Sequence, residues 1–152
     1  MRAICHARAG VLSLLAAGCA APIEMGKDFV TLVGHEEAAD YRAVTGDDAR
    51  LWMRRFEDPN VADLEFWTQA LEYDFVQQRG YDLVAKGDVK NAADELGSWF
   101  QCAANVGGDR TGYLVAVWVR GREITVVEFA ARAEVFAARL DDVRRSLWTV
   151  RG

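Results

Sequence analysis

The feature that most constrains the fold is a series of four β-prone runs separated by short links. Each link contains glycine or polar turn-forming residues, and one of them is Arg120-Gly121-Arg122. Short links of this kind join antiparallel neighbours. The third run reads Tyr-Leu-Val-Ala-Val-Trp-Val, and its almost wholly apolar composition predicts an internal strand with both faces covered. The four predicted strands span residues 81–89, 96–104, 113–119 and 124–129.

Two further strands are predicted nearer the start of the chain, at 29–33 and 49–56. The polar segment 34–48 separates them. In the second strand Leu51 and Met53 share one face, and Trp52 lies on the other. Both faces of this strand are therefore expected to be at least partly covered.

Two helices complete the predicted elements. The first is expected over residues 60–78, because Asp58-Pro59 provides a polar cap and a proline for the first turn, and Gly80 ends it. Its apolar stripe predicts packing against the sheet, although an aromatic stripe can also bind a partner. The second helix is expected over residues 131–148. The first stripe consists of Leu64, Trp67, Leu71 and Phe75, widened by Phe66, Ala70 and Tyr73; the second consists of Phe136, Leu140, Val143 and Leu147.

Together these elements predict an α+β fold in which an antiparallel β-sheet is sandwiched with two main α-helices, in one domain over residues 28–152. The aromatic helix, the hairpins, the Arg120-Gly121-Arg122 turn and the tail 146–150 resemble the family that joins the photosystem protein PsbP to the transport factor Mog. This PsbP/Mog-like resemblance covers roughly residues 28–150 and implies a binding or assembly factor without a shared catalytic site. No functional residue of the family is carried over, because no motif matches.

The first eighteen residues form a separate segment. Basic residues at Arg2 and Arg8 precede the apolar run 11–17, which is shorter than the roughly 20 residues that span a bilayer. A short apolar core with a positive flank is typical of a signal peptide. The small residues Ala17 and Gly18 directly before Cys19 resemble the lipobox of bacterial lipoproteins, although Ala16 stands where that family most often has Leu.

The lipobox resemblance implies cleavage of residues 1–18 and attachment of diacylglycerol and an N-acyl chain to Cys19, with no other cofactor. Residues 19–27 would form a lipidated tether, whose eight residues after Cys19 reach no more than roughly 28 Å. Ala20 after the cysteine is compatible with sorting to the outer membrane. The expected location is therefore the bacterial cell envelope, lipid-anchored and facing the periplasm. Export and cleavage without lipidation is the alternative.

Charge and cysteine content restrict the partners. The net charge is −5, and the loss of Arg2 and Arg8 makes the chain more acidic. Nucleic-acid binding and polybasic adhesion to lipid both need excess Lys and Arg, so neither is expected. With Cys5 removed and Cys19 lipidated, only Cys102 remains. Its aromatic neighbours predict a buried thiol that serves as a small apolar side chain.

No residue set in the chain predicts catalysis. His35 is the one histidine outside the signal segment, and two glutamates follow it, but a zinc site needs three or four ligands at spaced positions. A solvated loop is expected there. Segment 107–112 is rich in glycine but lacks the lysine of a phosphate-binding loop. The prediction is therefore that the protein is not an enzyme.

The five tryptophans can belong either to the core or to a binding surface, because large aromatic side chains form both cores and interaction hot spots. Trp67 and Trp118 are assigned to the core, and Trp99 and Trp148 to a candidate binding surface. The leading hypothesis is a non-enzymatic interaction or assembly module with a protein partner in the envelope. The alternative is a carrier or sensor for a small apolar ligand, in a pocket lined by Trp67, Phe75 and Trp99.

Overall fold

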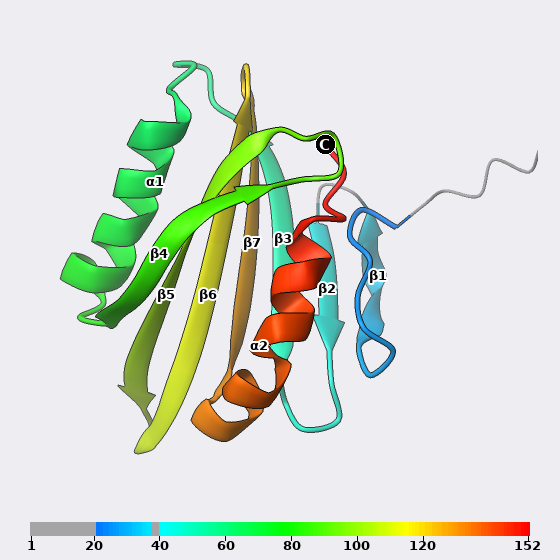
Figure 1. The fold of residues 1–152 in the computed structure, drawn as a ribbon, viewed down its shortest axis with the longest axis vertical. Coiled ribbons are helices and arrows are strands. Elements are labelled where there is room, and N and C mark those ends of the chain that lie inside the picture. Colours follow the sequence, from blue (N-terminus) through cyan, green and yellow to red (C-terminus); the bar gives the residue numbers. More distant parts are fainter. Residues whose placement is uncertain (1–20, 38–39) are drawn as a thin grey trace, which may run out of the picture.

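One antiparallel sheet of seven strands organises the protein, with strand order β1-β2-β3-β7-β6-β5-β4 (Figure 1). The computed structural model describes residues 21–37 and 40–152. The antiparallel sheet and the two main helices agree with the prediction. The elements are β1 (Val30–Glu37), β2 (Asp40–Val44), β3 (Arg50–Glu57), α1 (Leu64–Tyr73), the short π-helix η1 (Asp74–Gln78), β4 (Asp82–Lys90), β5 (Leu96–Val106), β6 (Asp109–Arg120), β7 (Glu123–Arg132) and α2 (Ala133–Leu147).

Strand β2 lies inside the segment 34–48, which was expected to be a polar link, so that expectation was wrong. Tyr41 and Ala43 are buried in the core, while Asp40 and Arg42 are more exposed on the other face. This alternation is that of a strand with one face on the core. β1 is also longer than predicted, so His35 lies in a strand rather than in a solvated loop.

The link between β5 and β6 is a turn at Gly107 and Gly108 rather than a loop over 107–112. Both glycines have positive φ, at 62° and 93°. A two-residue turn with this backbone matches the twist of the strands that it joins. β5 and β6 therefore pair along their whole length, up to Val106 opposite Asp109.

The two helices pack on opposite faces of the sheet. Successive side chains of β6 point alternately toward α2 and toward α1. Leu114, Ala116 and Trp118 belong to the core cluster that contains α2, and Val115 and Val117 belong to the cluster next to α1. Helix α2 lies very close to β6 at Gly112, where an added Cβ would be 2.4 Å from Cγ of Phe136.

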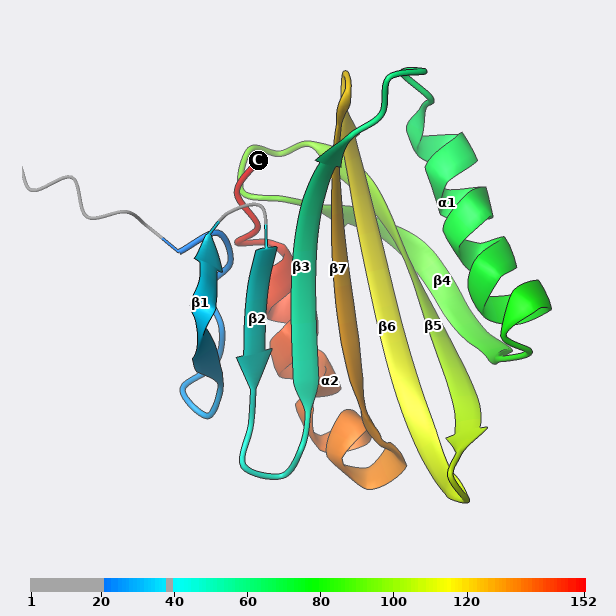
Figure 2. The same ribbon diagram turned by 180° about the vertical axis from the view of Figure 1, so that it is seen from behind.

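Helix α1 begins after Asp63, whose side chain accepts a hydrogen bond from the backbone N–H of Phe66 at 2.8 Å. In the loop before it, the backbone N–H groups of Ala62 and Asn60 donate to buried Asp58 and lower the pKa of that carboxyl. Helix α1 contacts β5 and β6 and so covers only part of the sheet face on which it lies. Figure 2 shows the same face over β1, β2, β3 and β7 without a helix.

Residues 22–24, just before β1, lie against the domain, although the sequence predicts a tether over 19–27 and a domain boundary at 28. Ile23 is fully buried, at 0% exposure, within the cluster that contains α2. The backbone N–H of Arg151 donates to the carbonyl of Pro22 at 2.9 Å, and the N–H of Glu24 donates to Oγ1 of Thr149 at 2.8 Å. The packed part of the chain therefore includes residues 22–24. Cys19 lies outside the described residues.

Candidate functional site

Helix α1 presents an aromatic surface that the sheet does not cover. None of its ten residues is fully buried. Trp67 and Leu71 pack against the sheet cluster, but the side chain of Phe66 is 56% exposed and that of Tyr73 is 58% exposed. The expectation that Phe66 and Tyr73 widen the core stripe was therefore wrong. They share a helix flank because they are seven residues apart.

Strand β3 adds a third exposed aromatic side chain to this surface. Phe56 lies on the face that β3 turns toward α1, and its ring meets that of Trp67 edge-on at a centroid distance of 5.3 Å. Phe66 meets the same indole edge-on at 5.9 Å. We call Phe56, Phe66 and Tyr73 the aromatic flank. Exposed aromatic clusters of this kind are typical of interfaces.

The uncovered sheet face beside the aromatic flank is polar. Trp52 on β3 lies between two guanidinium groups, with Cζ of Arg42 at 4.4 Å and Cζ of Arg54 at 4.3 Å from the ring centroid. Arg54 also pairs with Glu128. These cation–π contacts shield Trp52 from water. A groove of about 570 Å³ lies on this face, lined partly by Leu32, Val44, Trp52, Tyr113 and Ala130.

Asp40 joins this polar face to the edge of the sheet. Burial raises the pKa of its carboxyl, but hydrogen bonds from the Trp52 indole, from His35 and from Arg42 outweigh that effect and lower the pKa overall. Nδ1 of His35 is 3.0 Å from Oδ2 of Asp40. The Asp40 carboxylate therefore makes hydrogen bonds with three side chains, those of Trp52, His35 and Arg42. In the described part of the chain, no group of three His, Cys, Asp or Glu side chains is placed to hold a metal ion.

Trp99 and Trp148, the predicted binding surface, line one cleft of about 330 Å³ between β4, β5 and α2. Trp99 is half-buried, and the guanidinium of Arg144 stacks over its ring at 4.6 Å. Trp148 is 66% exposed. Trp118 is buried, as predicted, whereas Trp67 is only half-buried.

The pocket expected for a small apolar ligand does not form from its three predicted residues. Phe75 is buried and packs with Trp67 in the cluster next to α1, while Trp99 packs on the cluster that contains α2. A cleft of about 520 Å³ does lie between α1 and the β4–β5 hairpin, and Trp99 is the one of the three predicted residues that lines it. The ion pair from Lys86 Nζ to Glu72, at 3.0 Å, joins its two walls.

Cys102 is fully buried, at 0% exposure, which confirms the prediction of a buried thiol. Burial raises the pKa of the thiol to about 11, so little reactive thiolate forms near neutral pH. Among the described residues, no helix is long and apolar enough to cross a bilayer.

Comparisons with known proteins identify the fold. No protein-family model and no curated protein matches the sequence. Solved structures that are similar include the protein of unknown function PA94 from Pseudomonas aeruginosa, with a TM-score of 0.59, 11% identity, and coverage of 90% of this chain and 87% of that one. Cyanobacterial PsbP from Synechocystis is similar with a TM-score of 0.54 and 10% identity, over 82% of this chain and 83% of its own.

The Ran-binding protein Mog1p of Saccharomyces cerevisiae is also similar, with a TM-score of 0.51 and 10% identity, over 76% of this chain and 74% of its own. The resemblance of fold to PsbP and Mog is therefore confirmed. At such identities the likeness establishes the fold alone, and function has to be argued from the surface.

Sequence reasoning missed the aromatic flank, although the stripe held a signal for it. The side chains at 64, 67, 71 and 75 already form one complete helix face. Phe66 and Tyr73 lie beyond the edge of that face, so a flat sheet cannot bury them together with it. An apolar arc that is too wide for one packing partner indicates a second partner.

Proposed function

We propose that this protein is a lipid-anchored, non-enzymatic interaction module of the bacterial cell envelope, which binds a protein partner through the aromatic flank. The observation that carries the proposal is the exposure of Phe66 and Tyr73, each more than half open to solvent on a helix without a fully buried residue. Fully desolvated aromatic side chains are the usual hot spots of protein interfaces.

The composition around the aromatic flank favours a protein rather than an anionic lipid as its partner. Glu65 is exposed in the first turn of α1, and Asp74 follows its last turn. Acidic groups repel the anionic headgroups that attract peripheral proteins. Mog1p, which shares the fold, is described as a Ran-binding protein, so a surface of this fold can serve protein recognition.

The anchor in this proposal is Cys19, carrying diacylglycerol and an N-acyl chain, with the protein in the outer membrane and facing the periplasm. Its support is the lipobox-like Ala17-Gly18-Cys19 after a short apolar run. Two or more acyl chains give stable membrane attachment without a spanning helix.

Photo-crosslinking in cells tests the partner surface. A photoreactive phenylalanine analogue at position 66 or 73 is expected to give a discrete protein adduct, whereas the exposed control position Val106 at the far end of β5 gives none. Phe56→Ser is expected to weaken capture of the same adducted protein roughly thirtyfold, as for loss of a hot spot of about 2 kcal/mol. Equal adducts from position 106, or capture unaffected by Phe56→Ser, would refute the assigned surface.

The anchor is tested separately with two cysteine variants. Cys19→Ser is expected to move the protein out of the membrane fraction and to abolish the mass of the acyl chains on the N-terminal peptide. Cys5→Ser is the matched control, because Cys5 lies in the same segment and should leave both results unchanged. A Cys19→Ser protein that still partitions with the membrane would contradict lipid anchoring at this residue.

A further inference from the structure

The chain between Cys19 and the packed domain is short. The carbonyl of Pro22 accepts a hydrogen bond from the backbone N–H of Arg151 at 2.9 Å, and the backbone N–H of Glu24 donates to Oγ1 of Thr149 at 2.8 Å, so both residues are held to the segment after α2. Only Ala20 and Ala21 separate Cys19 from Pro22. Three residue steps reach no more than about 10 Å. If acyl chains on Cys19 enter a bilayer, the part of the domain around Pro22 has to lie directly at its surface.

Two exposed apolar side chains lie in this part of the domain. Trp148 directly precedes Thr149, which accepts the hydrogen bond from Glu24. The backbone N–H of Ala92 donates to the carbonyl of Val150 at 3.0 Å, and this bond brings the β4–β5 turn to the same place. Trp148 and Leu96 line one groove of about 500 Å³ there, and their side chains are 66% and 55% exposed.

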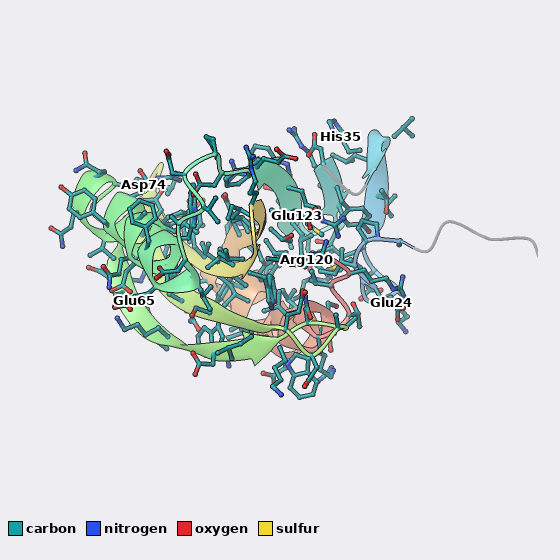
Figure 3. All side chains as sticks on the ribbon, turned by 90° about the horizontal axis from the view of Figure 1, so that it is seen from above. Glu24, His35, Glu65, Asp74, Arg120 and Glu123 are labelled. Atoms are coloured by element: carbon teal, nitrogen blue, oxygen red, sulfur yellow. The ribbon has the colours of Figure 1, made fainter. Side chains whose placement is uncertain are left out.

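Three charged side chains line this groove, and two of them, Lys90 and Asp94, form an ion pair, while Asp88 adds one negative charge. Lys90 Nζ is 2.9 Å from Oδ1 of Asp94, and Arg151 pairs with Glu24. Paired charges lower the repulsion that an acidic domain meets at a lipid surface. Figure 3 shows Glu24 on one side of the molecule, and Glu65 of α1 and Asp74 of η1 on the other. The aromatic flank is therefore on a different side from the Pro22 contact.

We infer that the lipid surface itself occupies the Trp148–Leu96 groove, with the indole of Trp148 in the headgroup region and the aromatic flank turned away. Indole rings prefer this region because one part of the ring is apolar and the N–H remains hydrated. The acyl chains on Cys19 are the first attachment of the domain to the bilayer, and Leu96 and Trp148 provide a second contact with it. Two contacts fix the orientation of the domain. The inference rests on the proposed lipidation of Cys19.

Fluorescence quenching in vesicles tests the orientation. The full-length lipidated protein is purified from membranes and reconstituted into phosphatidylcholine vesicles, with or without bromine atoms on the acyl chains. Bromine quenches only indoles in contact with the lipid. We expect quenching in the wild type and loss of most of it in Trp148→Phe. Trp52→Phe is the matched control and should keep the quenching, because Trp52 lies between Arg42 and Arg54 on the uncovered sheet face.

The outcomes separate this inference from the proposed function. Equal quenching in the wild type and Trp148→Phe, on a protein whose mass shows the acyl chains, overturns the inference and leaves the anchor intact. A mass without acyl chains overturns both. Protection of Trp148 from aqueous acrylamide in native envelopes, but not in pure vesicles, assigns the groove to a protein and also overturns the inference.

Discussion

The docking of residues 22–24 makes a prediction that a free tether does not. Ile23→Ala should destabilise the protein, because the Ile23 side chain is fully buried in the cluster that contains α2. If residues 19–27 were a solvated tether, the same substitution would change nothing. The variant therefore decides whether the domain begins before residue 28.

The magnitude follows from the atoms removed. Ile to Ala deletes three buried carbon atoms, worth about 0.8 kcal/mol each, or about 2.4 kcal/mol in total. Buried Ile to Ala substitutions cost about 2–5 kcal/mol when the cavity left behind is included. A segment that precedes the first strand can relax into the cavity. We therefore expect a loss of about 2–3 kcal/mol in the free energy of unfolding.

Urea unfolding of the chain beginning at Ala20, followed by tryptophan fluorescence, measures this loss. Val33→Ala is the matched control, because Val33 is 93% exposed on the edge strand β1, and its truncation should stay within about 0.5 kcal/mol of the parent. A loss below about 0.5 kcal/mol for Ile23→Ala would show that the segment is not packed in solution. The placement of Cys19 within about 10 Å of the packed domain would then be refuted as well.

Three further measurements test the fold. Cys102 should not react with a thiol reagent at pH 8 until urea unfolds the protein, because it is buried and its pKa is raised to about 11; rapid native reaction would contradict this. The pKa of Asp58 is lowered from its ordinary 3.8, so its stabilisation is complete above that pH and is lost as the pH falls through the folded-state value. Asp58→Asn should therefore flatten the acid limb of stability against pH, and an unchanged limb would refute the role. Gly112→Ala should cost about 1–3 kcal/mol in urea unfolding, because its Cβ would overlap Phe136, while Gly46→Ala, with open space around it, should cost nothing. Equal effects of the two alanines would argue against the close approach of α2.

The sequence predicted the four strands β4 to β7 because each is long, contains β-prone residues and has a clear turn beside it. It missed β2, where Asp40 and Arg42 interrupt a strand of five residues. So short a run, with charges at alternate positions, does not differ from a polar loop until its partners are known. The pairing of β2 with both β1 and β3 supplies that information.

The candidate site was harder to predict than the fold for two physical reasons. Helical spacing gives the direction of Phe66 and Tyr73 but not the width of the sheet surface beneath α1. The hydrogen bond between Glu24 and Thr149 joins residues 125 positions apart, and no local sequence pattern predicts it. Trp148 was assigned to a surface from its position along the chain, but its place beside the Pro22 contact follows only from that long-range pairing.

A short tether changes what an anchored domain can do. On a long linker the domain would present every face in turn, and a partner would have to select one orientation at an entropic cost. With residues 22–24 packed, the chain from Cys19 allows few orientations, and a lipid contact at Trp148 would reduce them further. The aromatic flank would then already point away from the bilayer when a partner arrives. The entropic cost of orienting the domain would therefore be paid before the partner binds. In this proposal the anchor at Cys19 would set the orientation of the Trp148–Leu96 groove and of the aromatic flank, and that orientation depends on the packing of Ile23.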